Sequence, residues 1–305
     1  MRIGLTVPQF GHFADPQATA RVAAEAESIG FDALWASDRT LWPLDPSEPY
    51  PSGDGSLPEE FAVFLDPIVT LTVAAGATSR VRLGTSTLNA LWQPPVMLAR
   101  SLASLDHVSN GRLDVGIGMG WSSDEYRAAG VPWTGKSARM EETLDLLEAL
   151  WGPDPVGHQG PLWQVPPSRV GLKPVQVPRP PILLGGVGAA ALERTGRRAD
   201  GWLGLNLPLP MLTRSWDAVR AAALKADRDP DALRFTLRVN IELAESEGDP
   251  GRGLPTGTFG QYTDYIRAAV DAGVQEVALE LQQSATGVAE LLDLAGRFHE
   301  VLRAG

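Results

Sequence analysis

Residues 81–121, VRLGTSTLNALWQPPVMLARSLASLDHVSNGRLDVGIGMGW, contain the pattern that decides the fold. A β-branched strand over Val81–Thr85 runs directly into small hydroxyl residues. An apolar helix over Pro95–His107 then leads to a second buried strand, Leu113–Ile117, that ends in glycines. Small side chains at the carboxyl ends of successive strands let a flat ligand approach the backbone. The stretch therefore predicts a strand–helix–strand unit whose strand ends form the floor of a ligand site.

The same alternation of short apolar strands and helix-period segments runs through the whole chain. Strands are predicted at Ile3–Val7, Ala33–Trp35, Val81–Thr85, Leu113–Ile117, Ile182–Leu184, Trp202–Leu205, Phe235–Glu242 and Glu276–Leu281. Helices are predicted at Pro16–Ile29, Pro67–Ser79, Pro95–His107, Ser137–Trp151, Ala189–Arg198, Pro210–Ala226, Phe259–Ala272 and Ala285–Leu302. This strict alternation favours an α/β fold of the closed (β/α)8 TIM barrel type over an open doubly wound sheet, which usually has fewer strands. We expect a single domain over residues 1–305.

Composition and charge exclude several classes of protein. The 305 residues are 44% apolar, which is ample for a buried core. The net charge is −11 and the 26 Lys and Arg residues are scattered, so nucleic acid and anionic membranes are poor partners. The absence of cysteine excludes disulfides, thiolate nucleophiles and Cys-ligated metals. The amino terminus lacks the pattern of a signal peptide and no apolar run is long enough to span a membrane, so a cytoplasmic protein is expected.

Two connections are too long to be simple turns. Leu41–Leu65 follows the second strand and contains five prolines, and Gly152–Pro181 precedes the fifth strand and is also rich in Pro and Gly. Long loops in compact domains are usually functional lids or disordered insertions. The first loop follows the carboxyl end of a strand, the face on which such barrels carry their active sites, so we interpret it as a substrate lid. The second starts on the opposite face and reaches the site only if it crosses over.

The residues after the strands are the candidates for chemistry. They are Pro8–Phe10, Ser37–Arg39, Thr85–Asn89, Gly118–Ser123, Gly185–Gly188 and Asn206. His12 is the only histidine near them and they hold no carboxylate cluster, so a metal site and glycosidase chemistry are both disfavoured. Asp38 and Arg39 are the adjacent charges at a strand end, with a structural ion pair at the barrel rim as the alternative reading.

The glycine-rich segment Gly185–Ala191 lies directly before a helix of small residues. Backbone N–H groups at such a helix start bind phosphate through hydrogen bonds and the positive end of the helix dipole. A dinucleotide fingerprint is a weaker interpretation, because Asp200 precedes its strand and does not close it. A tight strand-to-helix turn without a ligand is the remaining alternative.

Three of the nine tryptophans, Trp42, Trp92 and Trp121, lie just past strand ends, whereas Trp35, Trp151 and Trp202 fit core or inter-helix packing. Indole rings around a floor of small residues suit a planar, partly apolar cofactor or substrate. We therefore expect Trp42 and Trp92, together with Gln9, to shape a substrate pocket.

Seven segments spread over nearly the whole chain share one family pattern. They are IGFDALWASDR, SRVRLGTSTLN, PPVMLARSLASLDHVSNGRLDVGIGMGW, DEYRAAGVP, RMEETLDLLEALW, LKPVQVPRPPILLGGVGAAALERTGRRADGW and AGVQEVALEL. Together they resemble the bacterial luciferase-like monooxygenase superfamily, and within it the branch of oxidoreductases that use the 5-deazaflavin coenzyme F420. The combination GRLDVGIGMGW…EY…GVP…R…LW is specific to the superfamily.

The resemblance implies the positions of the cofactor-binding residues. A non-prolyl cis peptide is expected between Ser86 and Thr87, behind the central ring of the cofactor, and Asp38 is expected near that cofactor. The other residues that the resemblance implies are Asn89, Trp121 and Asp124 along the ring and tail, and Leu184, Gly185 and Gly186 at the phosphate. Some sugar-phosphate-oxidising relatives carry a histidine where this chain has Arg39. Their proton-abstracting group is therefore not reproduced here.

The function that the resemblance implies is hydride transfer between coenzyme F420 and a small organic substrate, with Asp38 and Arg39 orienting the ring or polarising the substrate. One alternative is an FMN-dependent monooxygenase on the same fold, supplied with reduced flavin by a separate reductase. Another is a non-catalytic flavin-binding protein. Relatives are commonly dimers, so a homodimer is expected.

Overall fold

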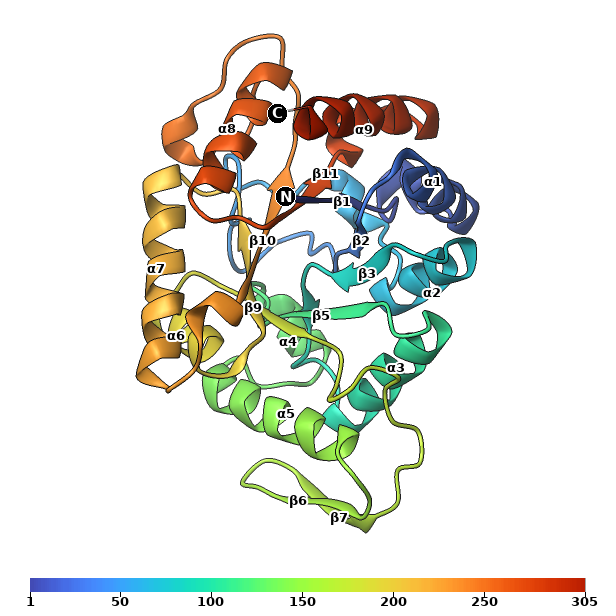
Figure 1. The fold of residues 1–305 in the computed structure, drawn as a ribbon, viewed down its shortest axis with the longest axis vertical. Coiled ribbons are helices and arrows are strands. Elements are labelled where there is room, and N and C mark those ends of the chain that lie inside the picture. Colours follow the sequence, from blue (N-terminus) through green and yellow to red (C-terminus); the bar gives the residue numbers. More distant parts are fainter. Residues whose placement is uncertain (305) are drawn as a thin grey trace.

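Eight parallel strands close into a barrel in the computed structural model, which describes residues 1–304 (Figure 1). The barrel strands are β1 (Arg2–Thr6), β2 (Ala33–Ala36), β3 (Arg82–Thr85), β5 (Leu113–Gly118), β8 (Ile182–Gly185), β9 (Gly201–Leu205), β10 (Arg234–Asn240) and β11 (Glu276–Glu280). Each strand is hydrogen-bonded to the next around the ring, and β1 pairs with β11 to complete it. The (β/α)8 architecture predicted from the alternation of elements is confirmed.

Helices surround the barrel on its outside (Figure 1). The eight that follow barrel strands as predicted are α1 (Pro16–Ile29), α2 (Pro67–Ala77), α3 (Pro95–Val108), α5 (Lys136–Trp151), α6 (Ala189–Arg198), α7 (Leu209–Lys225), α8 (Phe259–Asp271) and α9 (Val288–Arg303). The first shows how local sequence sets such bounds. Asp15 accepts a hydrogen bond from Gln17 N at the start of α1, and Gly30 adopts φ 108° at its end.

Four further strands and α-helices were not predicted. A short strand, β4 (Leu88–Asn89), pairs with β5, and a short helix, α4 (Ser123–Ala128), follows β5. The loop Gly152–Pro181 folds back on itself as an antiparallel hairpin of β6 (Val156–Gln159) and β7 (Gln164–Ser168). That hairpin lies outside α5, at the periphery of the molecule (Figure 1).

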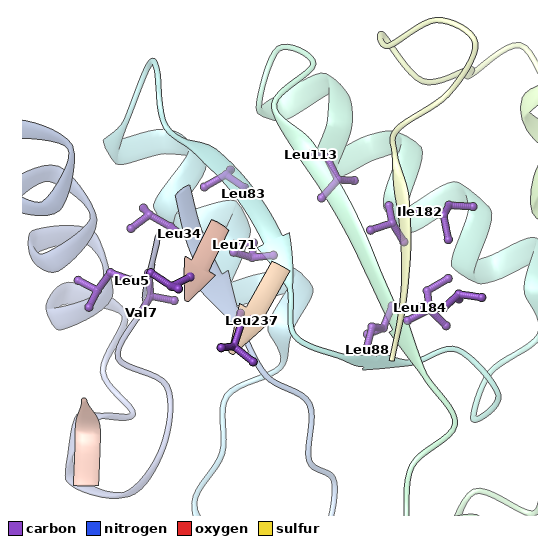
Figure 2. Packing of buried hydrophobic residues seen from close by; sticks show 14 of the residues in the cluster. Leu5, Val7, Leu34, Leu71, Leu83, Leu88, Leu113, Ile182, Leu184 and Leu237 are labelled. Atoms are coloured by element: carbon purple, nitrogen blue, oxygen red, sulfur yellow. The ribbon is translucent and has the colours of Figure 1, made fainter. Parts of the chain in front are cut away.

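The main hydrophobic core lies between the strands and the surrounding helices. Figure 2 shows part of it, in which Leu5, Leu34 and Leu83 from three neighbouring strands belong to one buried cluster with Leu71 of α2. All four side chains are fully buried, so this layer stabilises the ring of strands by apolar burial.

The interior of the barrel is filled by a smaller cluster around Trp35, with Ala33, Leu183, Leu203 and Ala278. The indole of Trp35 packs directly against the backbone of Gly4 and Gly84 on the two neighbouring strands. A Cβ on Gly4 would lie 2.7 Å from Trp35 Nε1, and a Cβ on Gly84 would collide with the ring, so only glycine fits at these positions. Trp35 is thus a core residue, as predicted.

Buried charges close the end of the barrel at which the strands begin. Asp114, with 0% exposure, accepts hydrogen bonds from Arg82 Nε at 2.7 Å and from Arg234 Nη1 at 2.8 Å. Arg234 Nη2 also lies 3.4 Å from Glu276 Oε2, and Trp35 Nε1 donates to Glu276 Oε1 at 3.0 Å. This network leaves the opposite end, where the strands finish, for a ligand. None of the helices formed by residues 1–304 combines the length and the apolar character needed to cross a membrane.

Candidate active site

A cavity of ≈ 280 Å³ opens at the carboxyl ends of the strands. Its walls come from the ends of β1, β2, β3, β5, β9 and β10, from β4 and α4, and from the loop Leu41–Leu65. The lining residues of this cavity, called here the central cavity, are Phe10, Ser37, Asp38, Arg39, Tyr50, Pro51, Ser52, Phe61, Phe64, Ser86, Thr87, Asn89, Trp92, Gly120, Trp121, Glu125, Leu205, Arg238 and Asn240. Five of them belong to the loop predicted to be a substrate lid, whereas the loop Gly152–Pro181 contributes none.

Seven of the residues to which the sequence analysis gave a catalytic, cofactor-binding or substrate-pocket role meet in the central cavity. They are Asp38, Arg39, Ser86, Thr87, Asn89, Trp92 and Trp121. They come from the ends of three different strands, so the convergence expected of residues at one end of a barrel places them together.

The peptide between Ser86 and Thr87 is cis, as the resemblance implied. Its surroundings are tightly defined. Arg238 Nη1 donates to the carbonyl oxygen of Ser86 at 2.7 Å, and a Cβ on Gly185 would lie 3.0 Å from Thr87 Cγ2. Gly118 also faces Thr87, since a Cβ there would collide with the hydroxyl. Glycines on two neighbouring strands therefore make room for this segment.

Asp38 carries the most strongly perturbed carboxyl group of the cavity. Burial raises the pKa of Asp38 to about 7, although Asn89 N donates to Asp38 Oδ2 at 2.9 Å and favours the ionised form. The negative charges of Asp66 and Glu125 raise this pKa further, while Arg39 lowers it. A carboxyl group with such a pKa holds or releases a proton near neutral pH.

Arg39 lies in a sandwich between a carboxylate and an indole. Its Nη1 is 3.8 Å from Glu125 Oε1, and its guanidinium carbon lies 4.8 Å from the centre of the Trp121 ring. Glu125 is fixed in turn, because its Oε1 accepts hydrogen bonds from Thr40 N at 2.7 Å and Leu41 N at 3.3 Å. Arg39 therefore pairs with Glu125 and forms no salt bridge with Asp38, unlike the alternative considered from the sequence.

A second arginine, Arg238, was missed by the sequence reasoning. It lies on β10, lines the central cavity, and donates through Nε to Asn240 Oδ1 at 2.8 Å and through Nη1 to Ser37 Oγ and Ser86 O. Its counter-charge is Glu280, 3.3 Å away, and burial raises the pKa of Glu280. The sequence did offer one signal for Arg238: a charged residue in the middle of the largely apolar strand β10 needs a buried partner or a functional role.

Three buried polar groups in the cavity wall have no hydrogen-bond partner among residues 1–304: Ser86 Oγ, Asn89 Nδ2 and Trp92 Nε1. Ser86 is 6% exposed and Asn89 is 4% exposed. Such groups normally find a partner, because leaving one unpaired costs about 1–3 kcal/mol. Asn89 Nδ2 and Trp92 Nε1 can only donate hydrogen bonds. This wall therefore fits a flat ligand whose edge carries carbonyl oxygens or ring nitrogens. A flavin or deazaflavin ring has such an edge.

Two expected substrate-pocket residues do not line the central cavity. Gln9 is 0% exposed, and its side chain joins Ser37 and Leu65: Nε2 donates to both carbonyl oxygens at 2.6 and 2.7 Å, and Oε1 accepts from Ser37 N at 2.7 Å. Trp42 Nε1 donates to Pro58 O at 3.0 Å, and the residue lines a separate surface cavity. Both therefore shape the loop Leu41–Leu65 and stay out of the pocket.

Asp124, expected beside the cofactor tail, also lies outside the central cavity. Its carboxylate accepts from Ser47 N and Ser47 Oγ, both at 2.8 Å, and pairs with Arg127. It borders the same surface cavity as Trp42. The hydrogen bonds from Ser47 and the charge of Arg127 lower the pKa of Asp124, so it acts as an anchor for the loop.

The predicted phosphate cradle lies beside the central cavity and does not line it. Leu184 is buried in the core, whereas Gly186 and Gly188 are exposed between β8 and α6. Gly186 adopts φ +109°, and a Cβ there would lie 3.0 Å from Ala191 Cβ. The amide groups of Ala189 and Ala190 at the start of α6 are not used by side-chain caps, so an anion can approach them.

Comparisons with known proteins show which sequences and folds this chain is similar to. The family model of luciferase-like monooxygenases matches residues 2–280. An uncharacterized protein of Mycobacterium tuberculosis is 35% identical over 251 residues, which cover 76% of this chain and 86% of that protein. The F420-dependent glucose-6-phosphate dehydrogenase of Amycolatopsis mediterranei is 29% identical over 76% of this chain and 66% of its own length.

A solved structure, the monooxygenase RslO1 from Streptomyces bottropensis, superposes with a TM-score of 0.79 over 100% of this chain and 99% of that one. Its sequence identity is 23%, so this likeness supports the fold alone.

Proposed function

The chain belongs to the luciferase-like monooxygenase family, and we propose that it is an oxidoreductase that transfers a hydride between the deazaflavin coenzyme F420 and a small organic substrate. The observation that carries the proposal is the wall of unpartnered groups at Ser86, Asn89 and Trp92, directly beside a carboxyl group whose pKa is about 7. A planar cofactor and a proton-exchanging group are the two parts that a hydride-transfer site needs.

Each part of the central cavity has a role in this proposal. Ser86, Asn89 and Trp92 would bind the polar edge of the ring, and Trp121 would pack on it. The start of α6, after Gly186, would hold the phosphate. When bound, coenzyme F420 supplies a ring carbon that gives or takes a hydride and does not readily activate O₂.

Asp38 would exchange the proton that accompanies the hydride. At neutral pH its carboxyl group is divided between the protonated and the ionised form, so it can donate a proton to, or accept one from, the substrate atom next to the reacting carbon. Arg39, held by Glu125, would polarise that atom. The loop Leu41–Leu65 would exclude water from the exchange.

The relative from Amycolatopsis, which is named as an F420-dependent enzyme, supports this cofactor over FMN. Titration of the purified protein with both cofactors, followed by their own absorption and fluorescence, tests the choice. Coenzyme F420 should bind at least about tenfold more tightly than FMN, which corresponds to about 1.4 kcal/mol. Equal or tighter binding of FMN would favour the FMN-dependent monooxygenase. The homodimer and the cytoplasmic location expected from the sequence stay proposals.

A further inference from the structure

One side of the central cavity carries hydrogen-bond donors that the protein itself does not use. Arg238 and Asn240 lie on β10 with one residue between them, so their side chains share one face of that strand. Tyr50 reaches the cavity from the long loop. All three residues line the central cavity and are partly buried. We call them the donor side, and none of them belongs to the wall assigned above to the cofactor ring.

Arg238 has one N–H group left over. A guanidinium group offers five N–H donors in a fixed plane. Nε donates to Asn240 Oδ1, and Nη1 donates to Ser37 Oγ and Ser86 O. Nη2 donates once, to Glu280 Oε2 at 3.3 Å. These four bonds fix the plane of the group, so the remaining Nη2–H is free for a ligand in the cavity that Arg238 lines.

Asn240 and Tyr50 add further free donors. The hydrogen bonds of Asn240 use its Oδ1 and its backbone N and O, so Nδ2, which can only donate, has no partner among residues 1–304. The Tyr50 hydroxyl also forms no hydrogen bond within this part of the chain. Its ring is held edge to face against Phe61, with ring centres 5.8 Å apart. A largely buried tyrosine hydroxyl normally finds a partner, so a ligand is the partner expected here.

The charges around the donor side favour an anion. Burial raises the pKa of Tyr50, whereas the positive charges of Arg238 and Arg39 lower it. Each of these two charges has a larger effect than the opposing charge of Glu280 or Glu60. The potential that these charges create at the Tyr50 hydroxyl is therefore positive. A carboxylate, which only accepts hydrogen bonds and has about four acceptor sites, matches both this potential and the free donors.

The cavity wall next to the donor side is aromatic. Phe10 lies edge to face against Phe61 with ring centres 4.9 Å apart, and stacks on Phe64 at 5.4 Å. All three rings line the central cavity, and none of them belongs to the wall assigned to the cofactor. The contact between Phe61 and Tyr50 joins the aromatic wall to the donor side. A ligand held there has an apolar part beside its anionic group.

We propose that the substrate of the hydride transfer, an inference that rests on the function proposed above, is a small apolar carboxylic acid. Its carboxylate accepts hydrogen bonds from Tyr50, Arg238 and Asn240, and its apolar part lies against the phenylalanines. Arg238 also holds the side chain of Ser37, the residue before Asp38. The carboxylate therefore anchors the substrate on the side of the cavity from which Asp38 exchanges a proton. Tyr50 and Asn240 are specificity-determining residues.

Three ligands of similar shape test the preference for a carboxylate: phenylacetate, phenylacetamide and 2-phenylethylamine. Their dissociation constants are measured by titration calorimetry with the full chain at low ionic strength and pH 7.5. Phenylacetate should bind at least about tenfold more tightly than the amide, or about 1.4 kcal/mol, and the amine should bind most weakly. Equal affinities, or tightest binding of the amine, would overturn the proposal.

Tyr50→Phe removes the hydroxyl and keeps the aromatic ring. It should weaken phenylacetate by about tenfold, because a hydrogen bond to a charged group is lost, and should weaken the amide less. Tyr265→Phe is the matched control. The Tyr265 hydroxyl donates to Leu207 O at 2.7 Å and the residue does not line the central cavity, so its variant should keep all three affinities. Unchanged binding of phenylacetate to Tyr50→Phe would refute the role of the hydroxyl.

Asn240→Asp keeps an oxygen for Arg238 Nε and replaces the free donor by a second anionic oxygen. The ratio of phenylacetate to phenylacetamide affinity should fall to about one, since two carboxylates repel each other. Asn110→Asp makes the same change of charge at an exposed residue in the turn before β5, at the opposite end of the barrel, and should keep the full ratio. A ratio that survives Asn240→Asp would overturn the proposal.

Binding of coenzyme F420 is followed separately in the same preparations through its absorption. Cofactor binding without a preference for the carboxylate would refute the substrate assignment and leave the proposed function standing. A preference for the carboxylate that depends on Tyr50 and Asn240, without cofactor binding, would support the carboxylate site and refute hydride transfer.

Discussion

Asn89 N donates a hydrogen bond to Asp38 Oδ2 at 2.9 Å and thereby joins the short strand β4 to the residues that follow β2. This bond favours the ionised carboxylate, yet burial is the larger effect and raises the pKa of Asp38 to about 7. The unfolded chain exposes the same carboxyl group to water. Asp38 consequently links the protonation of the site to the stability of the fold.

The pH dependence of stability should reveal this link. Between pH 4 and pH 7, approximately, the folded state holds the Asp38 proton more tightly than the unfolded state, so stability falls as pH rises through this window. Asp38→Asn removes the effect, and its stability relative to the natural protein should increase from about pH 4 to pH 7, by about 1.4 kcal/mol per unit of pKa difference. Urea unfolding at a series of pH values measures it. The exposed Asp271→Asn is the control, and parallel profiles for all three proteins would contradict the assignment.

Removal of the Arg39 guanidinium should destabilise the protein, because it leaves the buried carboxylate of Glu125 without its positive partner. In Arg39→Ala, the buried carboxylate of Glu125 keeps its backbone donors Thr40 and Leu41 but loses its counter-charge. We expect a loss of about 2–3 kcal/mol in the free energy of unfolding, at the low end for a broken buried pair because the ion pair spans 3.8 Å. The double variant Arg39→Ala/Glu125→Gln should recover part of that loss. Additive effects in this double-mutant cycle would show that the two side chains do not interact.

The buried network of Asp114, Arg82 and Arg234, at the end of the barrel where the strands begin, should contribute to stability and have no effect on cofactor binding. Burial opposes ionisation of Asp114, but hydrogen bonds and charges of Arg82 and Arg234 outweigh it and lower its pKa. Asp114→Asn leaves these arginines without their shared anion and should cost about 3–5 kcal/mol. The contribution of Asp114 to stability should be present above its unfolded pKa and be lost as pH falls through its lower folded value.

Cofactor affinity, measured below the unfolding transition, provides the control for Asp114→Asn. It should equal that of the natural protein, because Asp114 lies at the start of β5 and the central cavity lies beyond its end. A lower affinity would mean that the two ends of the barrel are coupled.

Much of the fold could be predicted from sequence because barrel strands are buried on both faces and read as short apolar runs between helices. The hairpin β6–β7 escaped prediction since Pro166 and Pro167 lie within β7, and proline argues against a strand unless it lies at an edge. Helix α4 was missed because its six residues are too few for a periodic pattern.

The candidate site was predictable in position and less so in detail. Residues directly after a strand, such as Asp38 and Ser86, are brought together by barrel topology alone. The direction of a side chain in an irregular loop depends on contacts distant in sequence. Gln9 turns toward Leu65, and Trp42 is held by Pro58, which no local pattern specifies. Tyr50 and Phe61 reach the cavity through the same irregular loop, so they too escaped the sequence reasoning.

Substitution of Gly186, in the predicted phosphate cradle, can be compared with the same substitution at a glycine of similar backbone conformation outside the site. The comparison separates the effect of backbone strain on stability from the effect on cofactor binding. Gly186 has φ +109° and a Cβ there would lie 3.0 Å from Ala191 Cβ, so Gly186→Ala should cost about 1 kcal/mol of stability or somewhat more. Gly273, in the turn before β11 at the opposite end of the barrel, is a close match: its φ is +106° and a Cβ would lie 3.2 Å from Trp216 Nε1. Both alanine variants should therefore lower the melting temperature by similar amounts.

Cofactor binding should distinguish the two glycines. Gly186→Ala narrows the approach to the amide groups at the start of α6, so the affinity for coenzyme F420 should fall by about tenfold or more, which corresponds to about 1.4 kcal/mol. Gly273→Ala should leave that affinity unchanged, because its turn lies away from every strand end that lines the cavity. Inorganic phosphate added at increasing concentration should compete with the cofactor in the natural protein and much less in Gly186→Ala. If both variants bind the cofactor equally well, the segment Gly185–Ala191 is a tight turn between β8 and α6 and the phosphate lies elsewhere.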